Sequence, residues 1–207
     1  MRGPRTLVKV CGVRDAVSAV AAVEAGADLI GFQFCLSRRR LTPEEAIAIV
    51  RELPRRPALV GVFIDEDPRR AEEIAGAVGL DLLQLNGSEP AGYPVTRPVM
   101  KVLKVGDGDI PGGSGWPDPI MLDSWSVDQR GGTGRTWDWG RASDLIRRRR
   151  VFVAGGLHPA NVGALVREHR PHGVDVSSGV ESEPGRKDPE LVRAFVEAVR
   201  RADDERA

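Results

Sequence analysis

The sequence predicts an α/β protein with one domain over residues 1–207, folded as a small (β/α)8 TIM barrel. Eight short apolar runs recur along the chain with helical stretches between them, which is the count and order of elements in such a barrel. Most runs lack strict alternation of polar and apolar residues, as is typical of parallel strands covered on both faces. An open doubly wound sheet normally has fewer strands and a GxGxxG first turn, which this sequence lacks.

The strand-like runs are short and bounded by polar or glycine-containing stretches. In the first run, Val8 and Val10 are β-branched residues two positions apart, which suits a buried strand that ends at Gly12. The eight expected strands are residues 6–11, 28–34, 58–64, 81–85, 98–105, 119–123, 151–155 and 173–177.

Helices are expected between these strands. The clearest ones cover residues 15–25, 42–53, 67–79 and 188–202. The second begins with Thr42 as N-cap, Pro43 at the first helical position and Glu45 completing a capping box. Residues 86–97 and 106–118 are rich in Gly and Pro, so the helices after strands four and five should be short or missing.

Composition excludes several classes of protein. Thirty basic and thirty acidic residues cancel, so net charge gives no argument for binding nucleic acid or an anionic membrane. The apolar runs are too short to span a bilayer, and the first residues do not resemble a secretory signal, so a cytoplasmic protein is expected. Two distant cysteines predict neither a disulfide framework nor a cysteine-rich zinc site, and the three histidines show no ligand spacing. We expect no metal.

The carboxyl ends of the strands carry polar residues, and in these barrels the chemistry lies at that face. The expected set is Cys11, Asp65, Gln84, Asn86, Lys104, Asp123, residues 154–157 and residues 175–180. The last two stretches contain small residues at the ends of strands seven and eight, where such barrels commonly bind phosphate through backbone N–H groups. We expect Gly155, Gly156, Ser177, Ser178 and Gly179 to hold a phosphate. The competing interpretation is that they only form turns.

Cys11 and Asp123 each allow two interpretations from the residues alone. An unpaired cysteine is more often a small buried apolar residue than a reagent. The carboxylate at the end of strand six can either cap a helix or take part in chemistry.

Several motifs follow a familiar order along residues 6–201. They are "KVCG" (9–12), "GFQF" (31–34) with Ser37–Arg39, "GVF" (61–63), "QLNG" (84–87), "MLDS" (121–124) with "GGTGRTWDW" (131–139), "VAGGL" (153–157) and "GVDVSSGVES" (173–182) followed by "EPGRKD" (183–188). Together they resemble the phosphoribosylanthranilate isomerase family of tryptophan biosynthesis.

The resemblance implies an Amadori rearrangement of N-(5′-phosphoribosyl)anthranilate to 1-(o-carboxyphenylamino)-1-deoxyribulose 5-phosphate, with no cofactor. By motif match Cys11 is the general base and Asp123 the general acid, which must be held protonated. Lys9 lies two residues before Cys11 on the same side of the strand, and its charge would favour the thiolate. The partner expected is therefore a small phosphorylated substrate that carries an anthranilate group. The glycines of residues 131–139 would let that loop close over it.

The resemblance also assigns residues that contact the substrate. Arg39 matches the arginine that binds the anthranilate carboxylate, since a guanidinium fork suits a carboxylate. Three consecutive arginines leave Arg38 and Arg40 open as alternatives. The remaining contacts are expected from Lys9, Gln84, Asn86 and Asp175.

The chain departs from the family pattern at Asn86, where members usually have histidine. Asn86 keeps a donor and an acceptor but cannot titrate near neutrality. A related barrel of the histidine pathway uses aspartates on strands one and five, whereas this chain has Cys11 and Lys104 there. A non-catalytic phosphate-binding barrel would have lost Cys11 or Asp123, and both are present. Family members occur as monomers and homodimers, and the sequence does not separate the two.

Overall fold

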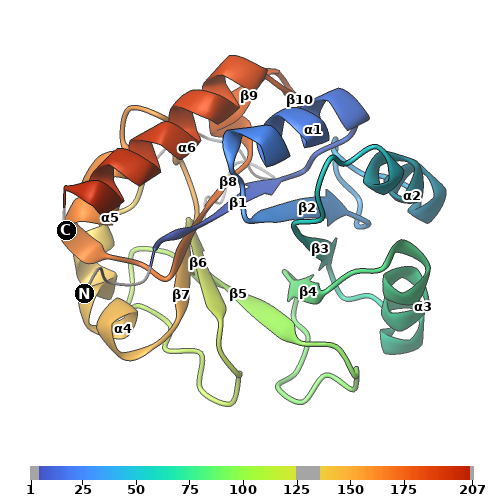
Figure 1. The fold of residues 1–207 in the computed structure, drawn as a ribbon. Helices are drawn as coiled ribbons and strands as arrows, with labels where there is room; N and C mark the ends of the chain where they lie inside the picture. Colours follow the sequence, from blue (N-terminus) through green and yellow to red (C-terminus); the bar gives the residue numbers. More distant parts are fainter. Residues whose placement is uncertain (1–4, 125–135, 206–207) are drawn as a thin grey trace.

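The computed structural model describes residues 5–124 and 136–205, and it contains the predicted closed barrel (Figure 1). Eight parallel strands pair in chain order, and β8 pairs with β1 to close the sheet. The strands are β1 (Leu7–Cys11), β2 (Leu29–Gln33), β3 (Ala58–Phe63), β4 (Leu82–Leu85), β5 (Val99–Val105), β6 (Ile120–Ser124), β7 (Val151–Val153) and β8 (Gly173–Val176). The predicted fold class is confirmed, and the expected strands differ from the observed ones only at their ends.

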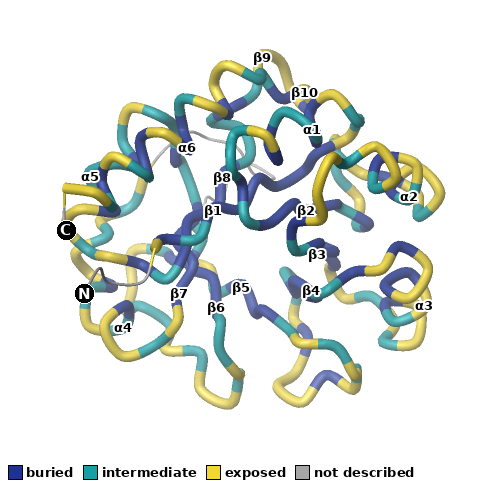
Figure 2. The backbone as a smooth tube through the Cα atoms, viewed as in Figure 1, coloured by how far each residue is buried: buried dark blue, intermediate teal, exposed yellow. Residues whose placement is uncertain are grey.

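Side chains at alternate positions of the strands fill the barrel interior. They form one buried apolar cluster, made of Leu29, Val60, Leu82, Met100, Val102, Met121, Phe152 and Ala154. The Phe152 ring lies against Gly173 of the neighbouring strand, where a Cβ would come within 2.4 Å of the ring. Figure 2 shows buried strands at the centre and exposed outer faces on the helices. A packed interior leaves only the ends of the barrel for a site.

Six α-helices lie among the described residues, and four of them begin at an Asp or Thr whose side chain caps the helix. They are α1 (Ala16–Ala25), α2 (Pro43–Arg51), α3 (Pro68–Val78), α4 (Ser143–Arg148), α5 (Val162–His169) and α6 (Pro189–Asp204), with short 3-10 helices η1 (Trp139–Ala142) and η2 (Ser178–Val180). The capping box is confirmed, since Thr42 Oγ1 accepts from the Glu45 backbone N–H and the Glu45 carboxylate accepts from that of Thr42.

The connections after β4 and β5 contain no helix, as predicted. On the outer face of the barrel there, the Lys101 ammonium donates to a Glu89 carboxylate oxygen at 2.6 Å and to the Gly87 carbonyl at 2.5 Å. The same ammonium lies 5.3 Å from the centre of the Trp116 ring. This buried ion pair fixes the chain directly after Asn86 in place of a packed helix.

A small antiparallel hairpin follows η2 and was not predicted. It consists of β9 (Glu181–Glu183) and β10 (Arg186–Lys187), with Glu181 and Lys187 as register partners. Gly185 takes a φ of 91° in the turn, a conformation that favours glycine. The hairpin brings two buried charged side chains to the carboxyl end of the barrel.

Candidate active site

Cys11 lies at the carboxyl end of β1 and is 4% exposed. The thiol faces the barrel interior, because a Cβ on Gly31 would lie 3.1 Å from its sulfur, and Gly31 is two residues after Leu29 of the interior cluster. The same Cβ would lie 2.9 Å from Lys9 Nζ, so Lys9 and Cys11 share one face of β1, as expected for residues two apart. Gly31 therefore makes room for both side chains.

Lys9 is wholly buried and donates a 2.7 Å hydrogen bond to Asp175 of β8. Burial alone would lower the pKa of Lys9, but the negative charges of Asp175 and of the Cys11 thiolate outweigh it and raise that pKa. Both side chains were expected to contact the substrate. Their mutual bond leaves Lys9 beneath the thiol, with Asp175 as its countercharge.

One further contact orients the sulfur of Cys11. Gln33 of β2 points its Nε2 at the sulfur from 3.9 Å, and its Oε1 accepts a 2.5 Å hydrogen bond from the Ser37 hydroxyl. The Ser37 hydroxyl oxygen also accepts from the Arg39 backbone N–H. The loop after β2 thus determines which end of the Gln33 amide faces the thiol.

Asp123 lies near the end of β6, as predicted, and it forms an ion pair. Lys104 of β5, its register partner, donates to its Oδ2 at 2.5 Å. Sequence reasoning expected surroundings that keep Asp123 protonated, and the structure places the Lys104 ammonium beside it. A role as general acid therefore requires this pair to open.

Arg39 differs from its neighbours in the loop after β2. Its Nε and Nη2 donate to the two carboxylate oxygens of Glu181, both at 2.7 Å, whereas Arg38 and Arg40 are exposed. Lys187 donates to the same carboxylate at 2.8 Å. Burial opposes ionisation of Glu181, but the hydrogen bonds from Arg39 and the charge of Lys187 lower its pKa to about 2.

Sequence reasoning missed Glu181 and Lys187 as members of the site. The signal was present in "ESEPGRKD", where a Pro-Gly turn separates residues of opposite charge. Such a pattern predicts a hairpin with cross-strand ion pairs. It does not predict that Arg39, from a distant loop, forms an ion pair with the hairpin.

Gln84 and Asn86 lie on the same side of β4 and its extension. Gln84 Nε2 donates to Asn86 Oδ1 at 2.9 Å, while the buried Oε1 of Gln84 has no hydrogen-bond partner among the described residues. A buried carbonyl oxygen without a donor is costly.

The two loops expected to bind phosphate lie in contact. A Cβ on Gly179 would lie only 1.9 Å from the Leu157 carbonyl oxygen, so the loops after β7 and β8 touch through backbone atoms. Gly155 and Gly156 adopt φ values of 89° and 66°. Lys187 Nζ donates to the backbone carbonyl of Ser177 at 3.0 Å, which fixes the start of the second loop. Ser178 and Gly179 form the short helix η2.

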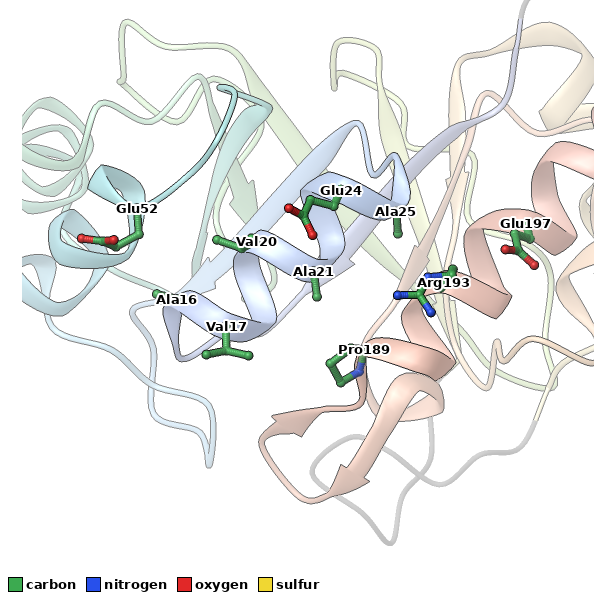
Figure 3. A pocket seen from close by; sticks show the side chains of 10 residues that line it. All are labelled: Ala16, Val17, Val20, Ala21, Glu24, Ala25, Glu52, Pro189, Arg193 and Glu197. Atoms are coloured by element: carbon green, nitrogen blue, oxygen red, sulfur yellow. The ribbon is translucent and has the colours of Figure 1, made fainter.

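A separate surface hollow lies between α1 and α6, away from these strand ends (Figure 3). Alanine and valine side chains of α1 line one wall, and Arg193 and Glu197 of α6 lie on the other. None of the predicted site residues lies there.

No described helix is long and apolar enough to cross a membrane, and the described residues contain no group of three or more His, Cys, Asp or Glu that could hold a metal ion. Residues 131–135 of the expected closing loop lie outside the described part of the chain.

A closed barrel with a thiol, carboxylates and cations at the carboxyl ends of its strands defines a (β/α)8-barrel enzyme. Residues 8–198 match the family model described as N-(5′-phosphoribosyl)anthranilate isomerase. The chain belongs to that family.

Relatives of this family are similar to this chain over nearly its whole length. The N-(5′-phosphoribosyl)anthranilate isomerase of Desulforudis audaxviator is 43% identical over 203 residues, covering 95% of this chain and 99% of that protein. The crystal structure of the phosphoribosyl anthranilate isomerase from Thermus thermophilus superposes with a TM-score of 0.85 at 31% identity, covering 95% and 99% of the two chains. Another isomerase structure, in complex with reduced 1-(o-carboxyphenylamino)-1-deoxyribulose 5-phosphate, has a TM-score of 0.80 at 32% identity and covers 94% and 98%.

Proposed function

We propose that this enzyme converts N-(5′-phosphoribosyl)anthranilate to 1-(o-carboxyphenylamino)-1-deoxyribulose 5-phosphate, in tryptophan biosynthesis. The observation that carries the proposal is the placement of Cys11 and Asp123 at the carboxyl ends of β1 and β6, in a chain that matches the family over residues 8–198. The relative solved with the reduced product analogue supports the same substrate class.

The reaction needs one acid and one base and no outside oxidant. Asp123 gives a proton to the furanose ring oxygen, the bond from that oxygen to C1′ breaks, and the nitrogen lone pair forms a Schiff base. The Cys11 thiolate then removes the C2′ proton, and the electron pair of that bond forms the C1′–C2′ double bond of an enolamine. The enolamine then takes up one proton at C1′ and loses the 2′-hydroxyl proton, while Cys11 releases a proton and Asp123 regains one. The protons therefore balance, C2′ is oxidised and C1′ is reduced.

The remaining contacts follow from the chemistry of the substrate. The phosphate would lie on the backbone N–H groups of the loops after β7 and β8, which include Gly156 and Gly179. Gln84 Oε1 would accept a hydrogen bond from a sugar hydroxyl, and Arg39 would bind the ring carboxylate. Lys104 must release Asp123 when the substrate enters, because the acid has to carry a proton at that step.

The protein is further proposed to work in the cytoplasm as a monomer or a homodimer. Its two cysteines are unpaired, which a reducing compartment preserves. A relative from Thermotoga maritima is described as dimeric. Sedimentation velocity at micromolar concentration separates the two oligomeric states.

The proposed function is tested by generating the substrate in situ and following the loss of its fluorescence. Wild type should turn it over, and Cys11→Ala should lower kcat about a hundredfold or more, as expected for loss of a general base. Cys35→Ala is the matched control, because Cys35 is the other free thiol and follows β2. Turnover that survives in Cys11→Ala would contradict the role of the thiol, and an inactive wild type would contradict the function itself.

A further inference from the structure

The hairpin formed by β9 and β10 meets Arg39 through a buried carboxylate. The Glu181 side chain is 5% exposed, that of Arg39 is 15% exposed and that of Lys187 is 1% exposed. Two cations and one anion leave this cluster with a net positive charge. A buried cluster of this kind at the end of the barrel can attract an anion while its members remain paired.

Glu181 occupies one edge of the Arg39 guanidinium and leaves the other edge available. Its two carboxylate oxygens accept from Nε and Nη2, each at 2.7 Å. Among the described residues, Arg39 Nη1 donates no hydrogen bond. The edge formed by Nη1 and Nη2 is therefore left for a second carboxylate, which can bind through two parallel hydrogen bonds.

The position of the Arg39 stem places this edge close to the thiol. A Cβ on Gly12 would lie 2.4 Å from Arg39 Cδ, so the stem crosses directly over the residue that follows Cys11. The charge of the Cys11 thiolate contributes to the raised pKa of Arg39, after the larger effect of its hydrogen bonds to Glu181. A ligand held at this edge thus lies beside the base.

We propose that Glu181 is a positioning residue, which fixes the Arg39 guanidinium so that its free edge receives the ring carboxylate of the substrate. The inference rests on the proposed function, and it adds a residue that the reaction itself does not require. An arginine held at one edge loses little conformational freedom when a ligand binds the other edge, so affinity for the carboxylate rises. Lys187 neutralises Glu181 and keeps the cluster cationic.

The sharpest variant is Glu181→Asp, which keeps the negative charge and shortens its reach by one methylene. Two ligands are compared by isothermal titration: reduced 1-(o-carboxyphenylamino)-1-deoxyribulose 5-phosphate and the same compound without the ring carboxylate. Glu181→Asp should weaken the first about tenfold and change the second less than about twofold. Glu183→Asp is the matched control, because it lies on the same strand, exposed and paired with Arg186, and should change neither.

A second experiment distinguishes a specific effect on Arg39 from a general disruption of this end of the barrel. Arg39→Lys removes the fork, so Glu181→Asp added to it should cause no further loss of the carboxylated ligand, whereas independent effects would add. Equal weakening of both ligands in Glu181→Asp, or unchanged binding of both, would overturn the positioning role. Wild type that turns over the substrate without preferring the carboxylated ligand overturns the inference and leaves the function standing.

Discussion

Lys9 and Asp175 join the first and last strands of the barrel through a hydrogen bond of 2.7 Å, directly beneath Cys11. The two residues are register partners, and the lysine side chain has no exposed surface. Because a buried ammonium is stable only beside a countercharge, this pair sets both the stability of the closed barrel and the field at the thiol.

Asp175→Asn should therefore lower the free energy of unfolding by about 3–5 kcal/mol, since it leaves the Lys9 charge buried and unpaired. Urea denaturation followed by circular dichroism measures the change. The double variant Lys9→Met/Asp175→Leu removes both charges and should regain most of the loss. A double variant as unstable as the single one would mean that packing, and not the unpaired charge, is responsible.

Glu181 should control the stability of the protein in acid. Its pKa of about 2 lies below the ordinary value of 4.5, so its contribution is present above pH 4.5 and is lost as the pH falls towards 2. The shift corresponds to about 3 kcal/mol. Unfolding free energies measured from pH 6 to pH 2 should fall less steeply for Glu181→Gln than for wild type. Parallel curves would show that other carboxylates set the acid limit.

Gln84→Met should separate ligand binding from folding. The substitution keeps the length of the side chain and removes a buried oxygen that has no described partner, but it also removes the Nε2 donor to Asn86. The two effects oppose each other, so the free energy of unfolding should change by less than about 1 kcal/mol. If that oxygen accepts from a sugar hydroxyl, KM should rise about tenfold. Steady-state kinetics and urea midpoints are measured on the same preparations. Unchanged KM would show that the oxygen does not contact the substrate.

Gly179→Ala should disrupt the contact between the loops after β7 and β8. The new Cβ would lie 1.9 Å from a backbone oxygen of Leu157, which no rotation of a side chain can relieve. Inhibition by inorganic phosphate should weaken about tenfold or more, because a displacement of about 1 Å misdirects the backbone N–H groups. Gly76→Ala is the control. A Cβ added at Gly76 of α3 would have Arg97 Nη2 as its nearest neighbour, at 3.9 Å, so this substitution should leave the stability of the protein unchanged or raise it slightly.

The sequence by itself determined the features that depend on residues close together in the chain. The caps at Thr42 and Asp67, the glycine stop at Gly79 and the apolar strands all follow from local backbone preferences and from the spacing of apolar residues. The barrel, its two connections without helices, and the placement of Cys11 and Asp123 at strand ends were therefore predictable.

Tertiary structure alone decided which charged groups meet. Arg39 and Glu181 are 142 residues apart in the chain, and Lys9 and Asp175 are 166 apart. Asp123 pairs with Lys104 because the register of β5 against β6 places the ammonium beside it. Such pairs depend on strand register and on the path of long loops, and neither leaves a local pattern in the sequence.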